Sequence, residues 1–215
     1  MRKIKNSCDV DLYKAINKRK VLEIGSNYGD ISFQILNMDP KELVASEVDK
    51  NFLQHLEARF NNSDNNISVS ELDIFNPRKD FKAQFDTVIL KEIINAFESK
   101  YYNAILSNSL LFLHNEGSLI IIDYLPHVHI RQLVTSILMS PLRTYKHIER
   151  YKYNIKHKEQ LDYKKLHEYF KEHKASVSFY KNVDPLNEFD SLLHKILEKI
   201  FPMKYMFIIK KNKFK

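Results

Sequence analysis

Short apolar runs alternate with amphipathic stretches along the first 125 residues of the chain. The apolar runs predict buried strands, which we place at 21–24, 42–47, 67–72, 85–90 and 118–123. Helices are predicted where apolar residues recur every three or four positions, as in 9–18, after 30, after 50 and in 101–113. Strands that alternate with helices in this way predict an open, parallel α/β sheet with helices on both faces.

The second half of the chain has a different pattern. Two further runs, 175–180 and 203–209, predict strands, and a helix with a strong apolar periodicity is expected over 189–200. Residues 126–160 have no counterpart in a minimal α/β fold. This segment opens with a broad apolar helix face and continues, after Pro141, with basic residues interleaved with tyrosines.

Composition narrows the class of protein. The chain has 215 residues, 44% of them hydrophobic and 28% charged, which is typical of one globular domain. No apolar run approaches the ~20 residues needed to cross a bilayer, and no apolar signal segment follows Met1. Cys8 is the sole cysteine, so no intrachain disulfide can form and we expect a reducing, cytoplasmic setting.

Charge is unevenly spread along the chain. Residues 1–125 carry 15 Lys/Arg and 18 Asp/Glu, whereas residues 126–215 carry 19 and 9, so the net charge of +7 belongs to the second half. Such asymmetry suggests an anionic partner, which could be a phosphorylated substrate, a nucleic acid or a membrane surface. A lysine-rich coding bias explains the same composition equally well.

The stretch 21–36 carries the clearest chemical signal. The run Val21 to Ile24 ends in two of the three glycines of the chain, Gly25 and Gly29, and a helical pattern follows at once. This predicts a strand, a tight turn and a helix. Glycines let the backbone turn sharply and approach a ligand closely, and the first amides of the helix are free donors. The alternative is a glycine-turned corner that binds nothing.

Residues 23–29, Glu-Ile-Gly-Ser-Asn-Tyr-Gly, resemble the first motif of class I S-adenosylmethionine-dependent methyltransferases. The motif differs from the dinucleotide-binding fingerprint because Asn27 stands where that fingerprint has a second glycine. The resemblance implies that S-adenosylmethionine is the cofactor and that this loop binds it. The residues of the loop that it assigns to the cofactor are Glu23, Gly25, Ser26, Asn27 and Gly29.

Three later segments place polar residues where predicted strands end. Glu47 ends the strand 42–47, where the family has the acid that binds the ribose hydroxyls, and the resemblance also places Val48 at the cofactor. Asp73 and Ile74 match the family's acid at the adenine amino group and the apolar residue that covers the ring. The segment FDTVILKEIINAF resembles the family's fourth strand and places Lys91 beside the cofactor and Glu92 beside the substrate. Carboxyl ends of parallel strands lie at one edge of a sheet, so all of these residues should meet there.

The acceptor side is less specific. The fourth strand lacks the Asp/Asn-Pro-Pro-Tyr motif of enzymes that methylate adenine or glutamine amino groups. A general base accelerates methyl transfer to a hydroxyl or amine by roughly 10²–10⁴-fold. Its candidates are His127, His129, Glu92, Asp123 and Tyr124. His127, His129 and Asp123 are eligible metal ligands, but we expect no metal.

The resemblance covers residues 20–125 and implies a seven-stranded sheet whose last strand is antiparallel. LLFLHNEGSLIIIDYL matches the family's fifth-strand element with Asn-Glu-Gly in place of Pro-Gly-Gly, and Gly117 is expected to end the preceding helix. We therefore expect one methyltransferase domain over 1–215 with a helical insert at about 126–160. The insert is a lid, a packing or homodimer surface, or a polynucleotide contact.

The function expected from these residues is methyl transfer to an oxygen or nitrogen of a small-molecule acceptor, with an anionic acceptor among the options. Two alternatives stay open at this point. One is an RNA methyltransferase that uses the basic second half of the chain. The other is a partner protein that binds S-adenosylmethionine without turnover.

Overall fold

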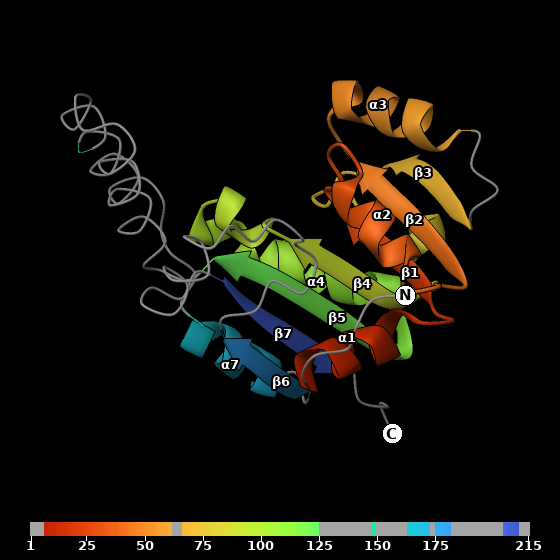
Figure 1. Cartoon of the computed structure of the whole chain (residues 1–215). Coiled ribbons are helices and arrows are strands. Elements are labelled where there is room, and N and C mark those ends of the chain that lie inside the picture. Colours follow the sequence, from red (N-terminus) through yellow and green to blue (C-terminus); the bar gives the residue numbers. More distant parts are fainter. Residues whose placement is uncertain are drawn as a thin grey trace.

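The computed structural model describes residues 7–61, 66–124, 148, 163–172, 175–181 and 204–210 (Figure 1). Its strands are β1 Lys20–Ile24, β2 Glu42–Glu47, β3 Ile67–Glu71, β4 Phe85–Lys91, β5 Leu113–Tyr124, β6 Ser176–Lys181 and β7 Lys204–Lys210. Its α-helices are α1 Ser7–Ile16, α2 Asp30–Leu36, α3 Lys50–Phe60, α4 Tyr102–Phe112 and α7 Tyr163–Glu172. Three short 3₁₀ turns are η1 Lys79–Phe81, η2 Ile94–Ala96 and η3 Ser99–Tyr101.

The strands form one sheet in the order β3-β2-β1-β4-β5-β7-β6. Strands β1 to β5 pair in parallel, and β7 runs antiparallel to both of its neighbours, β5 and β6. The order reverses between β1 and β4, which is the switch point at which open α/β sheets bind their ligands. This architecture confirms the predicted seven-stranded sheet with its antiparallel last strand.

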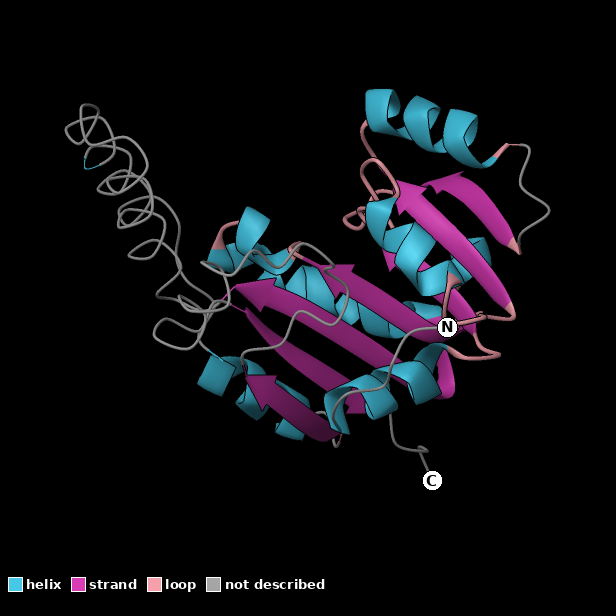
Figure 2. Ribbon diagram, in the orientation of Figure 1, coloured by secondary structure: helices cyan, strands magenta, loops and turns pink. Residues whose placement is uncertain are grey.

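Helices cover both faces of the sheet, as Figure 2 shows in cyan and magenta. Alternate residues of each strand point to opposite faces, so the strands feed two separate apolar cores. Val21, Ile89 and Ile120 pack with Leu12 of α1 and Ile35 of α2. On the other face, a second set of strand residues packs against α4 and α7; it includes Leu22, Val88, Ile121 and Phe207. Both predicted helix layers are therefore present.

The junction of α4 and β5 differs from the prediction. α4 ends at Phe112 and β5 begins at once at Leu113, so Gly117 lies inside the strand and does not end the helix. The pairing of β4 with β5 shifts register between Phe85 and Thr87. A side chain at Gly117 would place its Cβ 3.1 Å from the backbone oxygen of Asp86. Close approach of β4, rather than a helix end, explains this glycine.

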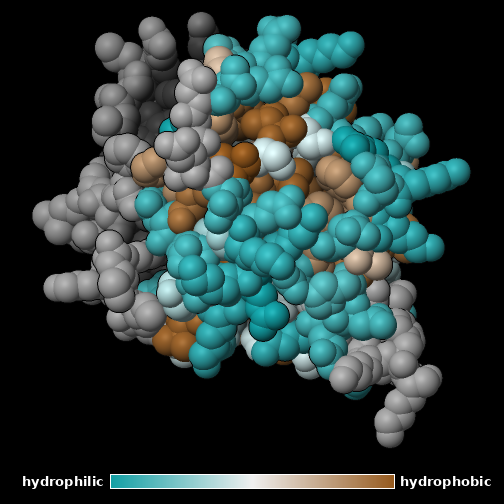
Figure 3. All heavy atoms as spheres, turned by 90° about the vertical axis from the view of Figure 1, so that its right-hand side faces the viewer, coloured by the Kyte–Doolittle hydropathy of each residue, from teal (hydrophilic) through white to brown (hydrophobic). Residues whose placement is uncertain are grey.

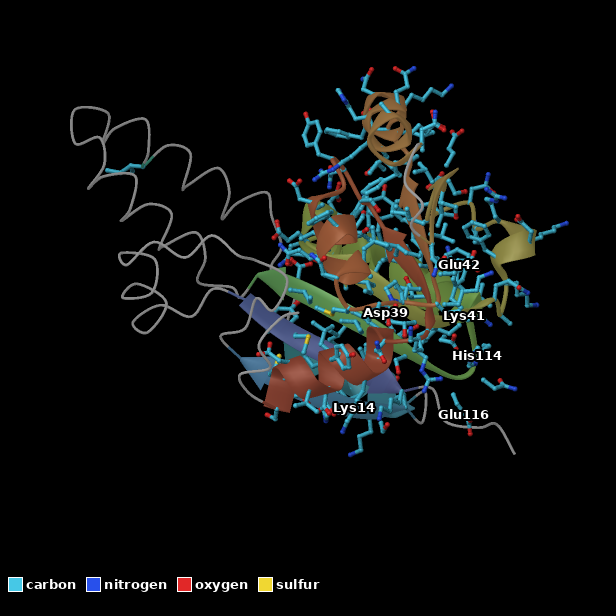
Figure 4. All side chains as sticks on the ribbon, turned by 45° about the vertical axis from the view of Figure 1, so that its right-hand side comes forward. Lys14, Asp39, Lys41, Glu42, His114 and Glu116 are labelled. Atoms are coloured by element: carbon cyan, nitrogen blue, oxygen red, sulfur yellow. The ribbon has the colours of Figure 1, made fainter. Side chains whose placement is uncertain are left out.

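Charged side chains gather where the parallel strands begin, at the end of the sheet opposite to their carboxyl ends. Figure 4 labels several of them, from α1, from the turn before β2 and from β5. Several charged residues at this end form pairs between elements: Lys18 with Asp39, Lys20 with Glu42, Arg19 with Asp86 and His114 with Asp86. Exposed ion pairs of this kind stabilise a fold only slightly, and they leave this end of the sheet with mixed charge.

The outer surface beside the edge strand β3 is mostly hydrophilic, with apolar atoms gathered in its upper half (Figure 3). Among the described residues, no helix is long and apolar enough to cross a membrane.

Candidate functional site

A pocket of about 1110 Å³ opens at the carboxyl ends of β1, β2 and β4. Its walls come from the loop after β1, the start of α2, the ends of β2 and β3, and the segment after β4. Of the cofactor residues predicted from the sequence, nine line this pocket: Glu23, Gly25, Ser26, Asn27, Glu47, Val48, Asp73, Ile74 and Lys91. The candidate base Glu92 lines it too. The topology thus brings together residues that lie up to 69 positions apart in the chain.

The loop between β1 and α2 has an unusual backbone. Three of its residues, Gly25, Asn27 and Gly29, have positive φ angles of 74°, 47° and 81°. Asparagine is among the few non-glycine residues that enter this left-handed region readily, so Asn27 takes the backbone shape that a second glycine would take. Its side-chain amide also donates to the Gly25 carbonyl at 3.1 Å. Asn27 therefore gives the loop the backbone conformation that the second glycine of the dinucleotide-binding fingerprint would give.

The two glycines of this loop have different reasons to lack a side chain. A Cβ on Gly25 would lie 2.3 Å from Cδ1 of Ile93, which belongs to the segment after β4 and packs against Gly25. A Cβ on Gly29 would lie 2.7 Å from Phe60 and 2.9 Å from Leu56, both in α3. Gly25 thus allows the loop to approach a pocket wall. Gly29 allows α3 to pack on the first turn of α2 and is not among the residues that line the pocket.

Three backbone amides hold the carboxylate of Glu47. It is buried at the end of β2, and Oε2 accepts a hydrogen bond of 2.9 Å from the amide of Asn27. Oε1 accepts from the amides of Val48 and Asp49 at 2.8 and 3.1 Å. Because each carboxylate oxygen can accept two hydrogen bonds, Oε2 keeps capacity for a hydroxyl of a ligand. Glu47 also fastens the glycine loop to β2, which the sequence did not indicate.

Asp73 and Ile74 follow β3 at the other side of the pocket. Asp73 is half-buried, and its Oδ1 accepts from the amide of Phe75 at 2.9 Å, which fixes a tight turn. Ile74 is buried, and its carbonyl accepts from Nδ2 of Asn108 at 2.7 Å. The turn places one carboxylate and one apolar side chain in the lining of the same cavity. Their contact with adenine stays a prediction.

Glu23 lies at the floor of the pocket, on the strand face that α2 covers. Its carboxylate is 2% exposed and accepts a hydrogen bond from the hydroxyl of Ser32 in α2. Burial raises the pKa of the Glu23 carboxyl to about 7, although the Ser32 hydrogen bond and the positive charge of Lys91 oppose the shift. Near neutral pH this side chain therefore exchanges a proton easily.

Lys91 ends β4, and Glu92 follows it with a left-handed backbone at φ 59°. The amide of Glu92 donates to the carbonyl of Ile122 in β5 at 2.8 Å. From this point the chain turns along the pocket, where Glu92, Ile93, Ala96 and Phe97 form one wall. We call residues 92–97 the pocket-wall segment.

Several aromatic side chains that were not predicted from the sequence line the pocket. Phe75 and Phe97 line it, and their rings meet edge to face at 5.1 Å, with Tyr101 5.3 Å from Phe75. On the other side, Tyr28 and Phe33 line the pocket and are more than half exposed. Tyr28 lies inside the loop motif and Phe75 directly follows Ile74, so adjacency was the sole clue to these two residues.

The charges of the pocket fit the implied cofactor. Five acidic residues line the pocket: Glu23, Asp30, Glu47, Asp73 and Glu92. Two basic residues, Arg59 and Lys91, line it as well. Asp30 and Arg59 pair with each other at 2.7 Å. S-adenosylmethionine presents ribose hydroxyl and adenine amino donors and a positive sulfonium, all of which favour carboxylates. The donor and charge pattern of this cavity therefore fits the cofactor.

The predicted bases His127 and His129 and the insert at about 126–160 lie outside the residues that the structure describes, apart from residue 148. Within those described residues, no group of three His, Cys, Asp or Glu side chains is arranged to hold a metal ion. The absence of a metal from the reaction stays a prediction.

Solved methyltransferases share this architecture. The chain resembles a SAM-dependent methyltransferase from Methanosarcina mazei, with a TM-score of 0.65 at 9% identity over 94% of this chain and 97% of the other. It also resembles the methyltransferase domain of bacterial CtHen1-C, with a TM-score of 0.64 at 14% identity over 95% of both chains. The N-methyltransferase NodS from Bradyrhizobium japonicum gives 0.58 at 13% identity, over 95% and 92%. At these identities the likeness shows the fold. No curated protein sequence matches the chain.

The sequence itself matches the family described as "Methyltransferase small domain" over residues 10–155, which is more than half of the chain. That span contains all strands and loops that build the pocket. The chain belongs to this family, and it is an S-adenosylmethionine-dependent methyltransferase of the class I fold.

Proposed function

We propose that this enzyme methylates an oxygen or nitrogen atom of a small-molecule acceptor. The observation that carries the proposal is the excess of carboxylates in the pocket. With the Asp30–Arg59 pair and the buried Glu23 set aside, three carboxylates remain against one lysine: Glu47, Asp73 and Glu92 against Lys91. A polynucleotide brings a row of phosphates to an enzyme, and such a wall repels them. A small neutral or cationic acceptor meets no such barrier. An anionic acceptor would depend on the basic residues of the insert, which lies outside the described residues.

The residues of the pocket have separable roles in this proposal. The loop 25–29 and Glu47 hold the cofactor, which supplies a methyl group on an activated sulfonium when bound. Asp73 and Ile74 contact the adenine ring of the cofactor, and Lys91 supplies a positive charge near the floor of the pocket. The protein then mainly aligns the acceptor with the methyl group and excludes water.

Proton removal from the acceptor falls to one of three candidates in our proposal. Glu92 lines the pocket at the start of the pocket-wall segment and is half-buried. His127 and His129 come shortly after β5 in the chain. We extend the proposal to the insert at about 126–160 as a lid within a single domain, in a cytoplasmic protein. A homodimer formed through the insert remains part of this hypothesis.

Binding of S-adenosylhomocysteine, measured by titration calorimetry, is the first test. A crystal structure with that ligand would then show the acceptor space beyond its sulfur, whose shape and polarity define the acceptor class. The proposal predicts a compact, enclosed space next to Glu92. Absence of binding by the folded protein would contradict the proposal.

An RNA acceptor is the second candidate, because residues 126–215 carry 19 Lys/Arg against 9 Asp/Glu. RNA binding by such a surface weakens steeply with salt. A filter-binding titration of a structured RNA between 50 and 300 mM salt separates the two functions. Tight, strongly salt-dependent binding would favour RNA, and weak binding throughout would favour the small molecule.

A further inference from the structure

Asp123 lies at the end of β5, beside the pocket-wall segment. Its position four residues before the first candidate histidine, His127, makes it look like another base. The structure gives it a different setting. Asp123 is 0% exposed, and it is not among the residues that line the pocket. Within the described residues, this carboxylate faces Asn95 and not the pocket.

Both oxygens of Asp123 hold the same residue of the pocket-wall segment. Oδ2 accepts from the backbone amide of Asn95 at 3.1 Å, and Oδ1 accepts from the side-chain amide of Asn95 at 2.9 Å. Two hydrogen bonds from one residue to one carboxylate fix orientation as well as distance. Asn95 is the middle residue of η2, the 3₁₀ turn of the segment.

The neighbouring residue of β5 adds a third point of attachment. The carbonyl of Ile122 accepts from the amide of Glu92 at 2.8 Å. Glu92 has a left-handed backbone at φ 59°, a conformation that persists in a non-glycine residue when its surroundings impose it. Consecutive residues of β5 therefore set both the start and the middle of the segment.

β5 is a rigid support for these contacts. It pairs with β4 on one side and with β7 on the other, and Asp123 stands opposite Tyr205 of β7. Tyr205 is itself fully buried. A strand paired on both sides moves little, so Asp123 transmits the position of the sheet to the pocket wall.

The wall in turn contacts the loop after β1. Cδ1 of Ile93 occupies the space in front of Gly25, where a Cβ would come within 2.3 Å. Ile93 stands between Glu92 and the residue that Asp123 holds. A shift of the pocket-wall segment would therefore change two things at once: the packing of Ile93 against the loop after β1, and the position of Glu92.

We propose that Asp123 is a positioning residue that clamps the pocket-wall segment through Asn95, and thereby sets the distance between the cofactor loop and the acceptor side of the pocket. This inference rests on the proposed function of the pocket. It assigns Asp123 a role through Asn95 and excludes it as the general base.

The test uses the full chain and compares Asp123→Asn with the double variant Asp123→Asn/Asn95→Asp. In the single variant the carboxylate charge is lost, so the contacts of residue 123 with Asn95 become weaker neutral hydrogen bonds, and the side-chain contact forms only after the Asn95 amide turns over. In the double variant the two groups exchange roles, because the amide at 123 can donate to the new carboxylate at 95 and still accept from the backbone amide there. Asp80→Asn, an exposed carboxylate paired with Arg78, is the control.

Hydrogen–deuterium exchange without ligand is the first readout. We expect exchange of the amides of 92–97 to be roughly tenfold faster in Asp123→Asn, with the strands β1 to β4 unchanged. The double variant should return within about twofold of the parent. Unchanged exchange in 92–97, equal acceleration over the whole sheet, or failure of the double variant to restore protection would each overturn the clamp.

Titration with S-adenosylhomocysteine is the second readout. We expect Asp123→Asn to weaken binding by about three- to tenfold, with recovery in the double variant. A purely structural role would lower the urea midpoint and leave affinity of the folded fraction unchanged. If the parent protein binds no S-adenosylhomocysteine while the exchange result holds, the clamp stands and the proposed function fails.

Discussion

Glu23 makes the stability of this protein depend on pH in a way that one substitution should remove. The carboxyl is 2% exposed and its pKa is raised from 4.5 to about 7, chiefly by burial. In the unfolded chain the same group titrates near its ordinary value. Glu23→Gln keeps the shape of the side chain and abolishes its charge, so it isolates this contribution.

The sign follows from which state binds the proton more tightly. Between pH 4.5 and 7 the folded protein keeps a proton on Glu23 that the unfolded chain has lost. Stability from this group is therefore fully present below pH 4.5, falls as pH rises, and levels off above about pH 7. With about 1.4 kcal/mol for each pKa unit, the free energy of unfolding should lose about 3 kcal/mol over that window.

Urea unfolding from pH 4 to 8.5, followed by circular dichroism without ligand, measures the effect. The difference between the parent and Glu23→Gln cancels the titration of all other groups, and we expect it to change by about 3 kcal/mol across the window. Ser32→Ala removes a hydrogen bond that lowers the pKa of Glu23. In this variant the pH at which the stability difference levels off should therefore be higher. Glu71→Gln, an exposed glutamate of β3, is the control. A difference that stays constant with pH would refute the reasoning.

Three further substitutions test the pocket and the sheet. Glu47→Ala removes the acceptor of three backbone amides and should weaken S-adenosylhomocysteine binding by ~1–3 kcal/mol in calorimetry; its register partner Glu71, changed to Ala, should not. Equal affinity of both variants would show that the ribose acid is elsewhere. Gly25→Ala meets a left-handed φ of 74° and the methyl of Ile93, so the free energy of unfolding should fall by ~1–3 kcal/mol, and an unchanged urea midpoint would disprove the strain. Gly117→Ala forces a Cβ to 3.1 Å from a backbone oxygen of β4 and should cost ~1–2 kcal/mol, with the cofactor affinity unaffected; loss of affinity alone would contradict a purely structural glycine.

The elements of the sheet could be predicted because their signals are local. Burial on both faces requires continuous apolar runs, and these mark β2 at Glu42–Glu47 as the structure has it. The positions of the site residues also followed, since parallel strands end at one edge and each end carried its polar residue. The match between expected and observed pocket residues in 23–27, 47–48 and 73–74 has this topological cause.

The pocket wall after β4 could not be predicted in the same way. Ile93 and Phe97 look like ordinary apolar residues of a short turn. In the fold, Ile93 lies beside Gly25, about 70 residues earlier in the chain, and Phe97 lies beside Phe75, about 20 residues earlier. Contacts between residues so far apart in the chain depend on the tertiary structure. A glycine such as Gly117 is equally ambiguous. Sequence allows it to end a helix or to admit a neighbouring strand, and the position of β4 decided between them.

The amino-acid sequence alone thus determined the order and type of the elements, the glycine loop and the acids that end the strands, because hydrophobic periodicity and turn chemistry act over a few residues. The tertiary structure decided what each acid does. Glu23 is buried under α2, and its pKa is raised. Glu47 accepts hydrogen bonds from three backbone amides. Asp123 lies outside the pocket lining and accepts two hydrogen bonds from Asn95. Three carboxylates near the carboxyl ends of parallel strands look alike in the sequence. They differ because burial and hydrogen-bond partners come from distant segments, and only the folded chain brings those segments together.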